Sequence, residues 1–234
     1  MKQHLRLMAI AITSTLLFAA CKKDKDEKVE ETPIKPGINY QLSFNKETTP
    51  GSTGNLSEIK TGVITWTSGY ATVSNITMEA TKDGQLVELK SDLSQRVDIF
   101  KLITTVSNFD IPAGTYQNIK FKTSIASSPS HHAFELKGSY QSNGTTTPIV
   151  VRVTQPVTFE VEHAAPVTIN AGEAFIALNK LDLAALTSGI TEEMLNNAVR
   201  NNGTIVITHY MNSNMYFMIG DIINQYLNIE VKKG

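Results

Sequence analysis

A pair of carboxylates is the first feature of this chain that could do chemistry. Glu160 and Glu162 stand two residues apart in VTFEVEH, so on a β-strand their side chains would share one face about 7 Å apart. That separation lies in the range for the two carboxyl groups of an inverting glycosidase. The two acids also alternate with Val157, Phe159 and Val161, as the solvent-facing residues of a half-buried strand do. We therefore interpret them as a polar strand face and predict no catalytic residue.

Two adjacent histidines, His131 and His132, are candidates for metal ligands. In an extended segment neighbouring side chains point to opposite faces, so these imidazoles cannot share an ion without an unusual turn. The other histidines after residue 20 are His163 and His209, and no HExxH or comparable spacing occurs. We predict no metal site. No GxSxG, P-loop or GxGxxG motif is present either, so we expect no cofactor and a protein that is not an enzyme.

Two aromatic residues, Trp66 and Tyr70, stand close together in TWTSGY near a turn. Each ring offers an apolar face and a polar group, so an exposed pair could stack on a sugar ring. The alternative is that Trp66, the only tryptophan, packs in the core. We keep both residues as candidates for ligand stacking. The stretch MNSNMYFM, residues 211–218, is interpreted as two strands or a strand and a turn that could contact another protein.

The chain begins with a basic segment followed by an apolar one. Lys2 and Arg6 come first, and residues 7–20 are almost wholly apolar. Fourteen residues are too few for a helix to cross a hydrocarbon core of about 30 Å, which takes roughly 20. The pattern is typical of a secretory signal peptide, which is removed from the mature protein. We predict that residues 1–20 form this signal peptide.

Cys21, the only cysteine of the 234 residues, directly follows the apolar segment. Ala19, Ala20 and Cys21 resemble the lipobox of bacterial lipoproteins, although Phe18 stands where leucine is common. The resemblance implies cleavage before Cys21, a diacylglycerol on its thiol and an acyl chain such as palmitate on its new amino group. Because two or more acyl chains anchor a protein stably, the expected protein is attached to a membrane and does not span it.

A charged segment, KKDKDEKVEETPIKPG, occupies residues 22–37 with five lysines and five acids. It cannot bury enough apolar surface to offset its ordering entropy, so residues 21–37 are predicted to be a lipidated, disordered tether. The charge run resembles the export signal of surface-exposed lipoproteins of the Bacteroidota, which implies an outer-membrane protein that faces outward. Removal of Lys2 and Arg6 changes the net charge from −1 to −3, which disfavours nucleic acid as a partner.

Alternation of apolar and polar residues dominates residues 38–234, a length that suffices for a hydrophobic core without disulfides. Many short strands at near-regular spacing predict a mainly β fold, an antiparallel β-sandwich of the Greek-key or prealbumin-like kind. The domain is expected to have one core, or two lobes divided near residues 124–131. The alternating segments are 38–44, 119–122, 149–153, 157–162 and 227–232, and the turn signals are Asp83-Gly84, Pro112-Ala113-Gly114, Asn143-Gly144 and Asn202-Gly203.

One short helix is predicted near residues 191–200, in TSGITEEMLNNAVRNNG. Thr191 can cap its N-terminus, and Glu192 and Glu193 suit the positive end of the helix dipole. Four apolar side chains then form one face, and Gly203 follows the end. We expect this helix to cover an open end or edge of the sandwich.

The segments SDLSQRVDIF and FDIPAGTYQNIKFK, residues 91–100 and 109–122, resemble a family of uncharacterised bacterial lipoproteins. The β-sandwich domain of that family carries a Pro-Ala-Gly-Thr-Tyr turn that leads into a strand. The family has no established catalytic residues, so the resemblance implies a fold and no site. The chain also resembles, more weakly, fimbrillin-type pilus subunits of the same bacterial group, which are lipoprotein precursors made of β-sandwiches.

The sequence thus predicts a non-catalytic role in binding, adhesion or surface structure, with a surface glycan or protein as the partner. Two alternatives stay open. A pilus subunit predicts a terminal strand, such as residues 225–232, that another subunit can displace. A glycan-active hydrolase predicts a concave pocket that holds two or more acids, with Glu160 or Asp98 among them.

Overall fold

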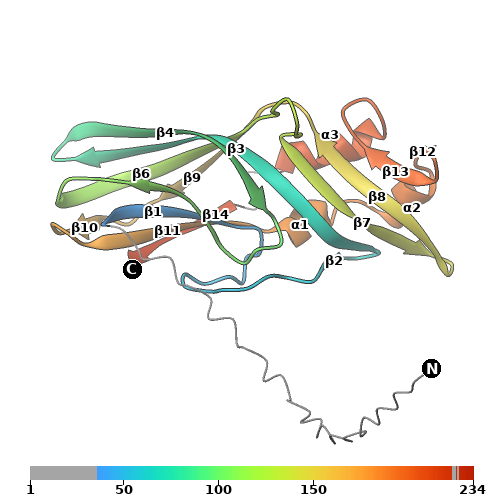
Figure 1. Ribbon diagram of the computed structural model, residues 1–234, viewed down its shortest axis with the longest axis horizontal. Coiled ribbons are helices and arrows are strands. Elements are labelled where there is room, and N and C mark those ends of the chain that lie inside the picture. The colour runs from blue at the N-terminus through green and yellow to red at the C-terminus, as the bar shows by residue number, and fades with distance from the viewer. Residues whose placement is uncertain (1–35, 223–224, 226) are drawn as a thin grey trace, which may run out of the picture. The chain divides into compact units, whose positions relative to one another are not determined.

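The long strand β3 (Ile64–Lys82) organises the larger of two sheets (Figure 1). Along one edge, its first half pairs with β7 (Phe134–Ser142) and its second half with β6 (Gly114–Ile125); β4 (Gln85–Asp98) pairs along the other edge. The sheet runs β10-β6-β3-β7-β8-β13-β12, with β2 and β4 on β3 and β9 on β6. The remaining strands are β2 (Ile59–Thr61), β8 (Thr145–Val153), β9 (Val157–His163), β10 (Val167–Ile169), β12 (Arg200–Asn201) and β13 (Thr204–Ile207).

The computed structural model describes residues 36–222, 225 and 227–234, and these described residues belong to one compact unit. The predicted signal peptide, Cys21 and the predicted tether up to residue 35 lie outside the described residues. The predicted division near residues 124–131 falls at the end of β6 and in the loop after it, where Ser128 and His131 form a β-bridge. Strands on both sides of that loop belong to the larger sheet.

A second sheet has the order β14 (Leu227–Lys233), β11 (Ala174–Leu181), β1 (Gly37–Ser43) and β5 (Thr104–Phe109). Two strand pairs are parallel, β1 with β11 and β8 with β13. The predicted mainly β fold is confirmed, and these two parallel pairs depart from the antiparallel pairing that was predicted. Parallel neighbours need a long connection, and the chain supplies one between β8 and β13, which includes four strands and two helices.

The two sheets are joined by a buried contact centred on Tyr40 of β1. Its ring stacks on Phe121 of β6 with centroids 4.9 Å apart. Its hydroxyl lies 2.6 Å from Oγ1 of Thr123 and accepts a 2.7 Å hydrogen bond from Nδ2 of Asn179 on β11. All four side chains are buried. Residues from three distant parts of the chain therefore meet in one polar cluster inside an apolar core.

Three predicted turns are confirmed as tight hairpins. Asp83-Gly84 joins β3 to β4, Asn143-Gly144 joins β7 to β8, and Asn202-Gly203 joins β12 to β13. Both residues of each pair have a positive φ, between 49° and 79°. That geometry belongs to a type I′ turn, whose twist matches that of the paired strands.

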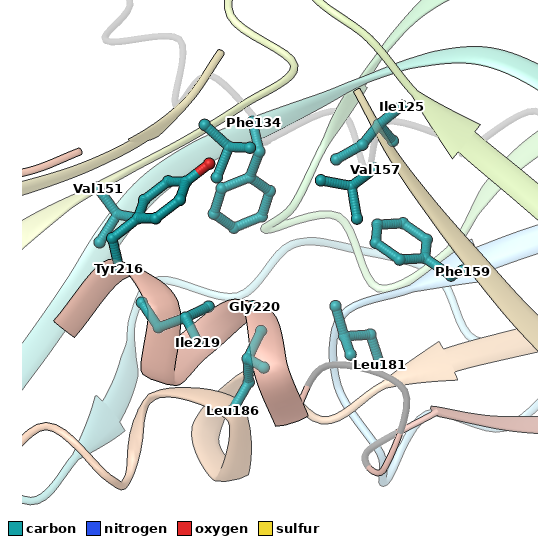
Figure 2. Close-up of a pocket in the computed structure, with 11 residues that line it drawn as sticks. Ile125, Phe134, Val151, Val157, Phe159, Leu181, Leu186, Tyr216, Ile219 and Gly220 are labelled. Atoms are coloured by element: carbon teal, nitrogen blue, oxygen red, sulfur yellow. The ribbon is translucent and has the colours of Figure 1, made fainter. Parts of the chain in front are cut away.

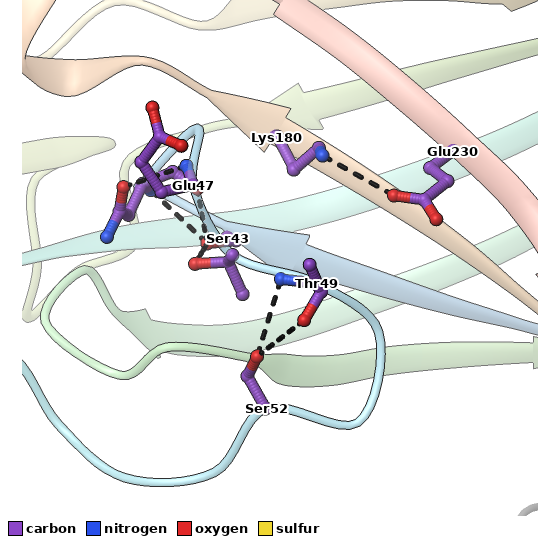
Figure 3. Close-up of polar contacts among 8 residues, drawn as sticks. Ser43, Glu47, Thr49, Ser52, Lys180 and Glu230 are labelled. Atoms are coloured by element: carbon purple, nitrogen blue, oxygen red, sulfur yellow. Dashed lines mark hydrogen bonds and ion pairs between the residues drawn. The ribbon is translucent and has the colours of Figure 1, made fainter.

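The strand predicted at residues 38–44 is confirmed, but it is buried on both faces. Its polar residues Asn39, Gln41 and Ser43 are 2% to 9% exposed. The loop after β1 folds back so that Oγ of Ser43 donates to Oγ1 of Thr48, 2.9 Å away. Figure 3 shows Ser43 with this loop and the ion pair between Lys180 and Glu230 on the neighbouring strands. The alternation of apolar and polar residues does not reveal that both faces of this strand are buried.

Two short helices follow β11 (Figure 1). The first packs against β2 and the start of β3, where Thr187 meets Thr61 and Trp66, and the second lies beside β7, where Asn196 accepts from Tyr140. In α1 (Leu183–Thr187), Asp182 caps the N-terminus by accepting from the backbone N–H of Ala185. In α2 (Glu192–Asn196), Thr191 accepts from the N–H of Met194, as predicted. The predicted helix near residues 191–200 is therefore confirmed at its start, but it ends at Asn196 and the chain enters β12 at Arg200.

The prediction of strands over residues 211–218 is wrong, because Ser213–Ile222 forms helix α3. Met215 and Ile219, four residues apart, are buried, whereas Phe217 between them is 47% exposed. This spacing has a helical period, which the continuous apolar run hides. Asn212 helps to start the helix: it has a φ of 53°, and its Nδ2 donates to the carbonyl groups of Val199 and Val206.

Candidate binding groove

A row of polar side chains crosses four strands of the larger sheet. Asp98 of β4 pairs with Tyr70 of β3, Tyr70 with Glu135 of β7, and Glu135 with Arg152 of β8. Residues directly opposite one another on neighbouring strands point to the same face of a sheet. The register therefore places an acid, a phenol, a second acid and a guanidinium side by side.

Part of this row lines a groove of about 330 Å³, which we call the polar groove. Strand β3 supplies a β-bulge between Trp66 and Ser68 at its edge, and bulges commonly redirect side chains next to functional sites. Four of the lining side chains are exposed, while Gly69 and Tyr70 are half-buried and Glu135 is buried. The lining residues are Ser68, Gly69, Tyr70, Arg96, Asp98, Glu135 and Lys137.

Tyr70 is held in place on several sides. The guanidinium of Arg96 lies 4.3 Å from the centre of its ring, a cation–π contact. The imidazole of His131 meets the ring edge-on at 5.6 Å and lies 3.3 Å from Nη1 of Arg96. The hydroxyl of Tyr70 accepts from the backbone N–H of His132. One ring face is covered by Arg96, so the guanidinium is the group that this cluster presents to the groove.

The two acids of the polar groove act as acceptors. Glu135 is 9% exposed at its side chain and forms ion pairs with Lys137 at 2.9 Å and with Arg152 at 2.8 Å. Burial opposes its ionisation, but the hydrogen bonds from the two cations outweigh burial and hold the pKa of Glu135 below its usual value. Oδ1 of Asp98 accepts from the backbone N–H of Phe100 at 2.9 Å. In the part of the chain that the structure describes, Arg96 forms no ion pair with a carboxylate.

The two predicted stacking residues lie in different places. Tyr70 is in the polar groove, but Trp66 is 0% exposed and donates from Nε1 to Oγ1 of Thr187 on α1 at 3.1 Å. The prediction of ligand stacking by Trp66 is therefore wrong, since no face of the indole is open to a ligand. Its core packing is the alternative that the sequence left open. Cys21 lies outside the described residues.

Of the other sequence candidates, Asp98 lines the polar groove with a second acid, Glu135, and His131 and His132 contact Tyr70 beside it. Glu160 and Glu162 lie elsewhere. Glu160 is on the open face of β9 and pairs with Lys120 at 2.9 Å; the hydrogen bond from Lys120 lowers the pKa of Glu160. Neither Glu160 nor Glu162 lines the polar groove. Over residues 36–222, 225 and 227–234, no three His, Cys, Asp or Glu side chains are grouped so that they could hold a metal ion. Sequence reasoning missed Arg96, Glu135 and Lys137, whose only signal was a charged residue within a strand.

A second exposed feature lies at the start of α3, where the sequence suggested a protein contact. His209 meets the rings of Tyr210, Tyr216 and Phe217 edge-on, with centroids 4.8 Å, 5.9 Å and 5.3 Å away. Tyr210 is 89% exposed. The aromatic rings pack on one another and on His209, so this cluster stabilises the turn into α3.

The chain matches no protein-family model, no curated protein and no solved structure. Within the described residues, no helix has the length and apolar character needed to cross a membrane.

Proposed function

We propose that this protein is a non-catalytic, lipid-anchored binding protein of the bacterial outer membrane that holds a neutral surface glycan in the polar groove. The observation that carries this proposal is the arrangement of Arg96, Asp98 and Tyr70 around an open groove, with Arg96 free of any carboxylate partner among the described residues. We also propose that the fold is a β-sandwich of the Greek-key, prealbumin-like kind.

The chemistry of the groove suits hydroxyl groups. A hydroxyl both donates and accepts hydrogen bonds, so neighbouring hydroxyls of a sugar can donate to Asp98 and accept from Arg96. Ser68 and Lys137 add further partners along the exposed wall. Two cations and two carboxylates line the groove, and this balance suits a neutral glycan better than a polyanion, which needs a basic excess.

Binding is favoured over hydrolysis by the state of Glu135, one of the two acids of the groove. A glycosidase needs one carboxyl group whose pKa is raised so that it can protonate the leaving oxygen. In the polar groove, Glu135 has a lowered pKa because two cations hydrogen-bond to it. A glycan-active hydrolase that uses this groove is therefore the weaker proposal.

A glycan array probed with the chain lacking residues 1–21 tests the groove. We expect binding to a restricted set of neutral glycans, and Arg96→Ala should weaken it at least tenfold through loss of two or more hydrogen bonds. The matched control is Arg200→Ala, since Arg200 is exposed on β12, away from the groove. Absence of glycan binding, or equal loss in both variants, would contradict the proposal.

The lipid anchor and the outward orientation are tested on cells. Intact cells that carry the wild type, Cys21→Ala or a variant in which all the charged residues from Lys22 to Lys28 are replaced by neutral ones are treated with protease. We expect digestion of the wild type, protection of the charge-neutral variant and loss of membrane association for Cys21→Ala. A wild type that fractionates with membranes but resists protease would assign the domain to the periplasm.

A pilus subunit is the second candidate function, and the position of β14 favours it. This C-terminal strand is at the edge of the smaller sheet, where β11 is its neighbour. An edge strand leaves a row of backbone groups that another chain can pair with. Heat-labile ladders on a denaturing gel are expected for a pilus subunit, and a single monomer band would exclude it.

A further inference from the structure

Strand β4 is an open edge of the larger sheet (Figure 1). Within the described residues it pairs with β3 and with no other strand; β5 comes close to it but pairs with β1. The strand is long and regular, since its 14 residues contain no proline or glycine. An open edge exposes unpaired backbone N–H and C=O groups, to which another strand can form hydrogen bonds.

Helices cover a different part of the larger sheet. Leu186 of α1 and Ile219 of α3 meet Phe134 and Phe159 of the strands around an apolar cavity of about 70 Å³ (Figure 2). No residue of β4 lines this cavity, and the inward side chains of residues 87–95 stay half-buried. The edge at β4 therefore keeps apolar surface that further burial would stabilise.

Side chains at the middle of β4 alternate between the two faces. Leu89, Ser91 and Leu93 are half-buried on the inner face, where the leucines pack against the core. Lys90 and Asp92 lie on the outer face, with side chains 56% and 75% exposed, and form an ion pair at 3.0 Å. The segment Leu-Lys-Ser-Asp-Leu is therefore complementary to itself when it is reversed, because leucine meets leucine and lysine meets aspartate.

We propose that β4 is an interaction surface for a second copy of this chain, whose β4 pairs with it in antiparallel orientation about a two-fold axis at Ser91. Such an interface uses the same patch on both copies. The axis places each Lys90 opposite Asp92 of the second copy, and each Leu89 opposite Leu93 of the second copy. Residues directly opposite one another lie on the same face, so the leucines extend the inner face and the charges meet on the outer one.

The charges of β4 select this register over its neighbours. A centre at Lys90 or at Asp92 would place that residue opposite its own copy, and a centre at Leu93 would place Lys90 opposite Arg96. Like charges directly opposite one another are destabilising. A centre at Leu89 avoids such pairs but joins fewer residues of the two strands. The proposed centre has no like-charge pair and joins nearly the whole length of both strands.

Disulfide formation tests the register. The chain lacking residues 1–21 contains no cysteine and retains the whole compact unit. In Ser91→Cys the two thiols would face each other, with Cα atoms about 4.5–5.5 Å apart, a distance that suits a disulfide. Ser94→Cys is the matched control, because its two copies would lie about 20 Å apart although its side chain is more exposed. Ser91→Cys should oxidise to a covalent dimer about tenfold faster than Ser94→Cys.

Exchange of charges tests the pairing without a covalent bond. Lys90→Glu and Asp92→Lys, measured separately by sedimentation equilibrium, should each weaken the dimer about tenfold, since each places two like-charge pairs in the interface. An equal mixture of the two variants should associate with nearly wild-type affinity, because opposite charges meet again. A variant that merely failed to fold would not be rescued by mixing. Arg200→Ala, exposed on β12, should dimerise like the wild type.

Three results would overturn the proposal. The first is a wild type that stays monomeric at the highest concentration at which it is soluble. The second is a covalent dimer that forms as fast from Ser94→Cys as from Ser91→Cys, or a mixture of the two charge variants that associates no more tightly than either variant alone. The third is a series of species larger than the dimer, which would assign association to the edge at β14. All of these are measured without a glycan, so they leave the polar groove untested.

Discussion

Trp66 and Tyr70 stand four residues apart on one strand, yet the first is buried in the core and the second lines the polar groove. On a regular strand an even spacing places two residues on the same face. The β-bulge between Trp66 and Ser68 adds one residue and reverses the alternation. The buried positions of β3 accordingly shift from Ile64 and Trp66 to Ala71 and Val73.

Trp66→Phe should lower the stability of the core without changing ligand binding in the polar groove. The change removes the 3.1 Å hydrogen bond to Thr187 and leaves a void in the core, so we expect a loss of about 1–3 kcal/mol of stability. Urea denaturation measures this loss. Glycan affinity should stay unchanged, and a parallel loss of affinity by the folded variant would mean that the indole contacts the ligand.

Stability should fall at high pH because of Tyr40. Burial raises the pKa of Tyr40 to about 12, and the hydrogen bonds with Thr123 and Asn179 counter this only in part. The ordinary value of about 10 applies in the unfolded chain, so the folded state holds the proton longer and stability declines as the pH rises from 10 to 12. Two pKa units correspond to roughly 3 kcal/mol.

Denaturant melts between pH 8 and 12 check this decline in the wild type and in Tyr40→Phe. The variant should lose the alkaline dependence that Tyr40 contributes, while Tyr210→Phe, at a position 89% exposed, should retain it. Identical pH profiles for wild type and Tyr40→Phe would contradict the assignment.

Acid should weaken the contact between the C-terminal strand and the β10–β11 turn. The hydrogen bond from Lys233, with those from the backbone and side-chain amides of Asn170, lowers the pKa of Glu173 to about 2. Because the folded pKa is lowered, the stabilisation is present above the ordinary value of 4.5 and is lost as the pH falls toward 2. Glu173→Gln should therefore be less stable than the wild type at pH 7 and equal to it near pH 2. Glu162→Gln, at an exposed position on β9, is the control in the same thermal melts.

Two glycines should respond to alanine in opposite directions. Gly220→Ala should stabilise the protein by about 0.5–1 kcal/mol, because glycine is unfavourable in a helix and nothing lies within 4 Å of the new Cβ. Gly138→Ala should destabilise it by about 1–3 kcal/mol, since its Cβ would lie 2.3 Å from the carbonyl oxygen of Thr65. Chemical denaturation of both variants measures the difference, and stability changes of the same sign would contradict the packing at these two glycines.

The sequence by itself determined the local features of this protein. The mainly β fold, the three Asn-Gly or Asp-Gly hairpins and the Thr191 cap follow from residues close together in the chain, so period and turn chemistry predicted them. The lipid anchor at Cys21, the surface location and the non-catalytic role stay predictions. Only the tertiary structure decided that Trp66 is buried, that Arg96 and Glu135 flank Tyr70, and that residues 213–222 form a helix. These features depend on bulges, strand register and long-range packing, which the alternation of residues along one segment does not encode.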